Sequence, residues 1–240
     1  MMHPEHTVKS YDSELKRLRT LIVDMGALVE QQLSRAIEAV AERDSHKANL
    51  VIELDPEVDQ REYIIDQFAV RLLALRQPVA HDLRQVVAAL KISSHLERIA
   101  DYAANVAKRA VFLNKTNVVN PVHLIPKMAL TTQNMIHGVL EAYMNLDDVM
   151  TTKIWKQDAE VDEMYGQLLK ELLEFMRDDP QYIAPCTHVL FMAKNIERIG
   201  DHVTNIAEVV HFITHGKPYT EPRPKVEEIE LNNIDTKPFR

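Results

Sequence analysis

Apolar residues recur at spacings of three and four positions along most of the chain, and no useful stretch alternates in the manner of a half-buried strand. This pattern is typical of amphipathic helices. Prolines, glycines and short polar runs interrupt it at few places, and these breaks mark the ends of the elements. They predict six helices, over residues 8–43, 46–76, 79–114, 121–147, 149–178 and 180–215. The chain is therefore predicted to be all-α.

The second half of the sequence repeats the first. Residues 25–44 align with residues 128–147 at an offset of 103, and the third predicted helices of the two halves align at an offset of 100. A repeat of this length is typical of a duplicated small domain. Long helices with short connections pack as antiparallel bundles, so the repeat predicts two similar antiparallel three-helix bundles in tandem. Their bounds are residues 1–115 and 116–216, and residues 217–240 are expected to form a flexible tail.

One polar motif occurs in both copies of the repeat. The string Glu-Arg-Ile-small-Asp spans residues 97–101 and returns at residues 197–201, and an asparagine follows each copy four positions later. The Glu, Asp and Asn of each copy fall on one face of a helix. Two carboxylates one turn apart repel each other unless a cation lies between them. Their presence in both copies therefore indicates a functional site.

The predicted surroundings of these carboxylates favour a cation site. On a helical wheel, Glu97 and Asp101 extend an apolar row of their helix and do not lie in the middle of its basic row, and Glu197 and Asp201 repeat this placement. A set of oxygen ligands favours hard cations such as magnesium, manganese, calcium or ferric iron over zinc. The expected cross-helix ligands, from the second helix of each half, are Asp59 and Asp162, with Asp55 and Asp158 one turn earlier.

The same carboxylates also have a purely structural interpretation. Arginines, either Arg98 and Arg198 or others from a neighbouring helix, would neutralise them in an ion-pair network. Side chains at adjacent helix positions do not face each other well, which argues against the two motif arginines. The basic row that contains Arg84 and Arg98 is interpreted as an ordinary solvated face, and docking of an acidic partner is the alternative.

Composition excludes several classes of protein. The formal net charge of −8 argues against nucleic acid as the main partner, because a phosphate backbone needs a basic surface. No apolar run reaches the ~18 residues that a membrane-spanning helix needs. The amino terminus lacks the basic and apolar regions of a secretory signal. The single cysteine, Cys186, is consistent with the cytosol and is predicted to be a small buried side chain.

Motifs for catalysis and for nucleotide binding are absent from the sequence. It contains no P-loop, no Rossmann fingerprint, no Gly-x-Ser-x-Gly, no Glu-x-x-His and no His-Glu-x-x-His. The eleven histidines are interpreted as surface residues. His202, beside Asp201, merits attention, although its counterpart Tyr102 argues against a role shared by both copies. Because no nucleophile or general base with partners can be assembled, we do not expect an enzyme.

Three segments together resemble the PhoU family of accessory and regulatory proteins of bacterial phosphate-specific transport. They are Met25-Gly26 with Val-Glu-Gln-Gln-Leu-Ser at residues 29–34, Arg-Gln-Pro-Val-Ala-His-Asp-Leu-Arg at residues 76–84, and the doubled Glu-Arg-Ile-[Ala/Gly]-Asp string. The resemblance covers residues 8–215 and implies two three-helix bundles of PhoU type.

The resemblance also implies a function. It implies a cytoplasmic, non-enzymatic regulator, typically a homodimer, that acts at the inner face of the membrane only through its partners. Members of the family are negative regulators that help to repress the phosphate-starvation regulon when phosphate is plentiful. They are thought to link the ATPase subunit of the phosphate ABC transporter to the sensor histidine kinase in signal transduction.

Metal ligands are implied by the same resemblance, because some members bind iron or other metal clusters through the acidic motifs. The residues carried over are Glu97, Asp101, Glu197 and Asp201, with Asp59 and Asp162 as further candidates, for divalent or iron ions. Ala100 stands where the second copy has Gly200, and its methyl group next to Asp101 affects how closely a neighbouring helix can approach, so the two sites need not bind metal equally. Two other functions stay open on residue chemistry: a metal-dependent hydrolase whose carboxylates activate water, and a structural helical adaptor with ion-paired carboxylates.

Overall fold

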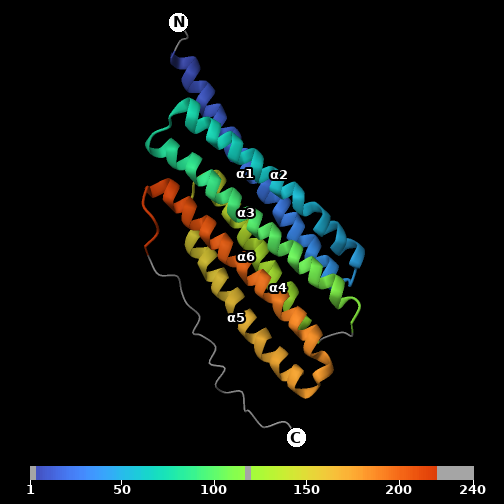
Figure 1. Ribbon diagram of the computed structural model, residues 1–240. Coiled ribbons are helices and arrows are strands. Elements are labelled where there is room, and N and C mark those ends of the chain that lie inside the picture. Colours follow the sequence, from blue (N-terminus) through green and yellow to red (C-terminus); the bar gives the residue numbers. More distant parts are fainter. Residues whose placement is uncertain (1–3, 117–119, 221–240) are drawn as a thin grey trace.

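The computed structural model describes residues 4–116 and 120–220, and every regular element within those ranges is a helix (Figure 1). The α-helices are α1 (Pro4–Ala41), α2 (Ser45–Arg76), α3 (Ala80–Leu113), α4 (Leu124–Asn145), α5 (Met150–Asp178) and α6 (Ile183–His215). Short 3-10 turns, Asn120–His123 and Pro180–Tyr182, precede α4 and α6. The predicted all-α class and the six helices are confirmed, with ends shifted by a few residues. Most of the predicted tail, residues 221–240, lies outside the described residues.

Local chemistry sets several of the helix ends. Asp44 caps α2, because its carboxylate accepts hydrogen bonds from the backbone N–H groups of His46 and Lys47 at 2.8 and 3.1 Å. At the other end of α2, Gln77 adopts a left-handed conformation with φ 47°, directly before a proline that cannot continue the helix. Gly216 ends α6 with φ 70°, a conformation that glycine adopts without strain.

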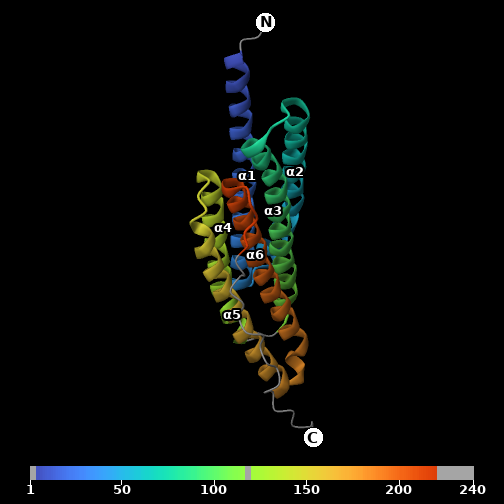
Figure 2. The same ribbon diagram turned by 90° about the vertical axis from the view of Figure 1, so that its left-hand side faces the viewer.

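The helices form two groups of three that pack side by side (Figures 1 and 2). Helices α1, α2 and α3 contact one another, and so do α4, α5 and α6. Packing of α3 against α6 and of α1 against α4 joins the groups, and one hydrophobic core runs through both. The largest fully buried side chains are aliphatic or methionine, among them Ile22, Met25, Leu96, Ile99, Met128 and Ile136. The division into two domains stays a prediction, because the shared core gives neither group a boundary of its own.

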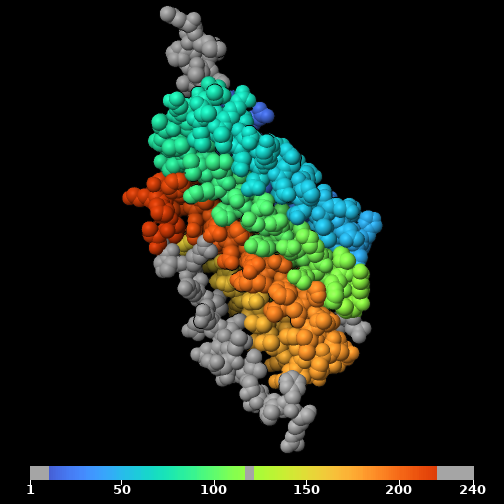
Figure 3. Space-filling view, viewed as in Figure 1, coloured from blue at the N-terminus to red at the C-terminus, as the bar shows by residue number. Residues whose placement is uncertain are grey.

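Helices α3 and α6 run antiparallel through the middle of the molecule, where they form adjacent bands on one face (Figure 3). Three contacts define their alignment: Arg84 with Ile213, His95 with His202, and Arg109 with His188. In each pair the two residues lie, to within one position, equally far in opposite directions from the midpoints of the two acidic motifs. The repeated strings therefore cross at the centre of this helix pair, as an approximate two-fold axis requires.

Two smaller predictions can be compared with the structure. Cys186 is fully buried in the core, as expected for a small apolar side chain. Among the described helices, none combines the length and the hydropathy that crossing a bilayer requires.

Candidate functional site

Five carboxylates from α2 and α3 gather in the first half of the chain. Glu97 and Asp101 lie one turn apart on α3, and Asp55, Asp59 and Glu62 lie on the facing helix α2. Burial raises the pKa of Glu97 to about 7, and the negative charges of Asp101, Glu62 and Asp59 contribute to this rise. We call these five residues the α2–α3 cluster. The structure thus brings together the residues predicted for this half.

Arg98 neutralises part of the α2–α3 cluster from its solvent side. Its Nε lies 3.4 Å from Glu97 Oε2, and its Nη1 lies 3.3 Å from Asp101 Oδ2. The expectation that a motif arginine does not face its neighbouring carboxylates well is therefore wrong for Arg98, because its long side chain folds back over them. That side chain is 57% exposed, whereas that of Glu97 is 19% exposed. Ion pairs of such an exposed arginine are weak, so an incoming cation could displace it.

Four carboxylates form the equivalent α5–α6 cluster in the second half. Asp158 and Asp162 lie on α5, and Glu197 and Asp201 lie on α6. Burial raises the pKa of Asp162 to about 6, with contributions from the charges of Glu197 and Asp201. Here the counterion is Lys194, whose Nζ lies 2.6 Å from Glu197 Oε2 and donates to Oε1 at 2.7 Å.

Two differences between the copies set the two clusters apart. Lys194 occupies the repeat position of Ser94, and Tyr165 occupies that of Glu62. The ammonium of Lys194 lies 5.3 Å from the centroid of the Tyr165 ring, within cation–π distance. The second copy has thus gained a cation and lost a carboxylate. The α2–α3 cluster offers an oxygen set that fits a hard cation, whereas an ammonium already occupies the α5–α6 cluster.

Glu62 and Lys194 were not predicted as site residues, although the spacing of each is visible in the sequence. Glu62 lies three positions after Asp59, which places both carboxylates on one face of α2. Lys194 lies three positions before Glu197, the spacing of a helical ion pair. Comparison of the two halves over whole helices, rather than over the motif alone, reveals both residues.

His95 and His202 meet between α3 and α6, so the prediction that the histidines lie on the surface is wrong for this pair. Their Nδ1 atoms lie 3.0 Å apart, which requires one ring to donate and the other to accept a hydrogen bond. Burial lowers the pKa of His95 to about 4, and the charge of His202 adds to this effect. Burial also lowers the pKa of His202. The lowered pKa values favour the neutral form of both rings at pH 7, and the hydrogen bond requires that the accepting Nδ1 carry no proton.

The predicted basic row does not form one open face. Arg84 is half-buried, and its Nε donates to the carbonyl oxygen of Ile213 at 3.2 Å, near the end of α6. Arg198, the counterpart of Arg98, lies with its guanidinium carbon 5.7 Å from the centroid of the Tyr102 ring. These two arginines therefore contribute to the α3–α6 contact.

Comparison with known proteins finds the same family in both halves. The PhoU domain matches residues 22–110 and 125–210. A phosphate-specific transport system accessory protein PhoU homolog from Caulobacter vibrioides is 45% identical over 224 residues, which cover 93% of this chain and 97% of the relative. The phosphate-specific transport system accessory protein PhoU from Serratia marcescens is 38% identical over 215 residues, which cover 89% of this chain and 88% of the relative.

Solved structures agree with this comparison. The crystal structure of PhoU from Pseudomonas aeruginosa superposes with a TM-score of 0.83 at 35% identity, covering 86% of this chain and 100% of that one. The phosphate transport system regulatory protein PhoU from Streptococcus pneumoniae gives a TM-score of 0.83 at 28% identity, with 88% and 100% covered. The two domain matches include the acidic motif of each half.

Proposed function

The chain belongs to the PhoU family, and from this membership we propose that it is an accessory protein of phosphate-specific transport that restrains the phosphate-starvation regulon when phosphate is plentiful. One observation carries the proposal: similarity to proteins named as accessory proteins of phosphate-specific transport runs through both halves and covers 93% of the chain. A match confined to one bundle would support the fold alone.

The proposal extends to partners. As a cytoplasmic homodimer without enzymatic activity, the protein would couple the ATPase subunit of the phosphate ABC transporter to a sensor histidine kinase. The net charge of −8 supports protein partners over nucleic acid. Sedimentation velocity of the purified chain tests the homodimer, and a monomer at all concentrations would contradict it. Co-purification with each partner tests the coupling.

The proposal also includes a hard cation, divalent or iron, at the α2–α3 cluster. Glu97, Asp101 and Asp59 would hold it, with Asp55 and Glu62 beside them. The raised pKa of Glu97 supports this assignment, because it reflects burial of the carboxyl group together with the negative charges of its neighbours, which Arg98 opposes only in part. A bound cation would supply that balance and tie α2 to α3. The α5–α6 cluster, which holds Lys194, is proposed as the weaker site.

Complementation tests the regulatory proposal. A strain that lacks the gene receives either the wild-type gene or one with Glu97→Gln, Asp101→Asn, Glu197→Gln and Asp201→Asn, and a phosphate-starvation reporter is read in phosphate-rich medium. A matched control neutralises four exposed carboxylates outside both clusters: Asp24→Asn, Glu53→Gln, Glu174→Gln and Asp178→Asn. Wild type and control should restore repression, whereas the cluster variant should not at equal abundance. Failure of the wild-type gene would overturn the regulatory role.

A metal-dependent hydrolase is a second candidate, because one observation favours it: a carboxyl group with a pKa of about 7 is suited to proton transfer at neutral pH. Turnover of phosphomonoesters and phosphodiesters by the purified protein with manganese or magnesium distinguishes the two functions. Activity that Glu97→Gln abolishes would support the hydrolase. If the protein complements the deletion strain but shows no turnover, the regulator remains as the one supported function.

A further inference from the structure

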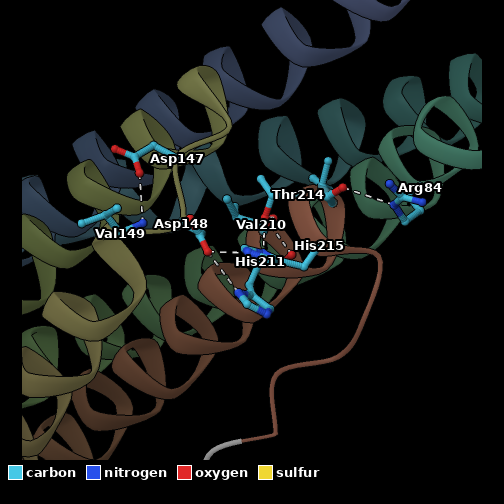
Figure 4. A network of polar contacts seen from close by, with 9 residues as sticks. Arg84, Asp147, Asp148, Val149, Val210, His211, Thr214 and His215 are labelled. Carbon is cyan, nitrogen blue, oxygen red and sulfur yellow. Dashed lines mark hydrogen bonds and ion pairs between the residues drawn. The ribbon is translucent and has the colours of Figure 1, made fainter.

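A group of metal-ligand side chains lies away from both carboxylate clusters, at the carboxyl end of α6 (Figure 4). His211 and His215 are four positions apart, so both rings project from one face of α6. The rings stack, with centroids 4.2 Å apart and planes inclined by 16°. Asp148, from the turn between α4 and α5, points its carboxylate at both rings.

The distances between the donor atoms suit a single tetrahedral ion. Asp148 Oδ2 lies 3.3 Å from His211 Nδ1 and 3.3 Å from His215 Nδ1. Zinc binds nitrogen and carboxylate oxygen at about 2.0–2.1 Å, and a tetrahedron of that size separates its corners by about 3.3 Å. One donor atom from each of the three residues lies within 4.8 Å of the others. An ion could therefore be bound with small side-chain movements.

We propose that Asp148, His211 and His215 form a binding site for a borderline divalent transition-metal ion, of which zinc is the type. Two imidazoles and one carboxylate leave a fourth position for water. Imidazole nitrogen selects zinc, cobalt or nickel, whereas the oxygen set of the α2–α3 cluster selects harder cations. The two sites thus differ in chemistry, and this proposal does not depend on the regulatory function.

Neighbouring side chains hold the three ligands in place. The side chain of His211 is 18% exposed, and the edge of the Tyr219 ring packs on it with centroids 4.8 Å apart. Thr214 Oγ1 donates to the carbonyl oxygen of His211 at 2.9 Å and lies 2.9 Å from His215 Nδ1. On metal binding, His211 Nδ1 would exchange its contact with Asp148 Oδ2 for the ion, and His215 Nδ1 would exchange its contacts with Asp148 Oδ2 and Thr214 Oγ1. The ion would then link the α4–α5 turn to the end of α6.

Titration of the full-length protein with zinc and cobalt tests the site. The Glu97→Gln, Asp101→Asn, Glu197→Gln, Asp201→Asn variant serves as the background, so that neither carboxylate cluster contributes. We expect one zinc ion per chain by calorimetry, with proton release, because the imidazoles must be neutral to bind it. Cobalt at the same site should give the intense visible absorption of a four-coordinate ion. His211→Gln and His215→Gln should each weaken binding by at least the ~10-fold that loss of a supporting residue costs.

His137 provides the matched control, because its Nδ1 lies 3.8 Å from Glu30 Oε2 without a second imidazole. His137→Gln should leave zinc affinity unchanged. If circular dichroism shows that a histidine variant is unfolded, Asp148→Asn decides the test. This change keeps the shape of the side chain and removes its charge, so it should weaken zinc binding. Wild-type affinity in the His211→Gln, His215→Gln double variant, or no zinc binding by the background protein, would overturn the proposal. The complementation assay of the regulatory proposal is a separate experiment, and its interpretation does not depend on whether zinc binds at this site.

Discussion

Gly200 of α6 packs directly against Asp158 of α5, so closely that a β-carbon on residue 200 would stand 2.6 Å from Asp158 Oδ1. The equivalent residues of the first half are Ala100 and Asp55. Ala100 carries its methyl group buried in the core. Asp55 accepts a hydrogen bond from Gln32 Nε2 at 3.3 Å. The equivalent aspartates of the two halves are therefore placed differently. Asp158 packs against Gly200, whereas Asp55, in the half that has Ala100, is hydrogen-bonded to Gln32.

A double-mutant cycle should detect the contact between Gly200 and Asp158. Helix propensity alone makes Gly→Ala stabilising by about 1 kcal/mol. In an Asp158→Ala background, Gly200→Ala should show that gain in urea denaturation. With Asp158 present, the new methyl must displace the carboxylate, so the gain should shrink or reverse, with a coupling of ~0.5 kcal/mol or more.

The same cycle on Ala100→Gly and Asp55→Ala is the control. Residue 100 already carries a methyl group and Asp55 is hydrogen-bonded to Gln32, so the two changes should be close to additive, within ~0.5 kcal/mol. Equal coupling in the two halves would contradict the interpretation that glycine at position 200 makes room for Asp158.

Lys194 should limit cation binding at the α5–α6 cluster. Lys194→Ser introduces the residue that the first half has at the repeat position, Ser94, and removes the ammonium from Glu197. Because a unit charge a few ångströms away is worth ~1 kcal/mol or more in this setting, manganese affinity of the cluster should rise by about 10-fold. Electron paramagnetic resonance of manganese titrations measures this. The reciprocal Ser94→Lys should weaken the α2–α3 cluster, and Lys170→Ser, at an exposed lysine of α5, should change neither.

Glu97 should make the protein less stable as pH rises toward neutrality. Folding raises its pKa from 4.5 to about 7, so the folded state holds the proton more tightly than the unfolded state does. The resulting stabilisation is fully present below about pH 4.5 and is lost as pH rises through about 7. Urea denaturation in chelator, from about pH 4.5 to 8, should show a declining difference between wild type and Glu97→Gln across this window.

Two additions sharpen that measurement. Glu53→Gln, at an exposed position of α2, should track wild type at every pH. Added manganese should reverse the decline in wild type, because a bound cation favours the ionised carboxylate. A constant difference between wild type and Glu97→Gln across the window would contradict a raised pKa.

The helices were predictable because their signal is local. Apolar side chains such as Val86, Leu96 and Ala103 recur on one face of α3, and all three are buried. The repeat also predicted that the acidic residues of α2 face those of α3 and that those of α5 face those of α6. A duplicated bundle places equivalent residues in equivalent positions. The placement of Arg98 did not follow, because a rule on adjacent helix positions ignores how far a long, exposed side chain can fold back.

Contacts between the two halves could not be obtained in this way. The pairing of His95 with His202 depends on the antiparallel alignment of α3 and α6, which no repeat within a half encodes. Likewise, the spacing of His211 and His215 is visible in the sequence, but Asp148 precedes them by some sixty positions. The packing of α4 and α5 against α6 brings that turn to the end of α6.

The His95–His202 contact predicts a loss of stability in mild acid, opposite in sign to the effect of Glu97. Folding lowers the pKa of His95 from 6.5 to about 4, so the unfolded state binds the proton more tightly. Stability from this contact is complete above about pH 6.5 and is lost as pH falls toward about 4, where a protonated His95 would face the ring of His202. The difference in unfolding free energy between wild type and His95→Gln should therefore shrink across this window.

NMR titration of the His95 ring should give a midpoint near pH 4. The control His81→Gln, at an exposed histidine of α3, should leave the loss of stability in mild acid unchanged. A midpoint near 6.5 for His95 would mean that the two rings are open to water, and that the α3–α6 contact at the motif is looser than the 3.0 Å separation indicates.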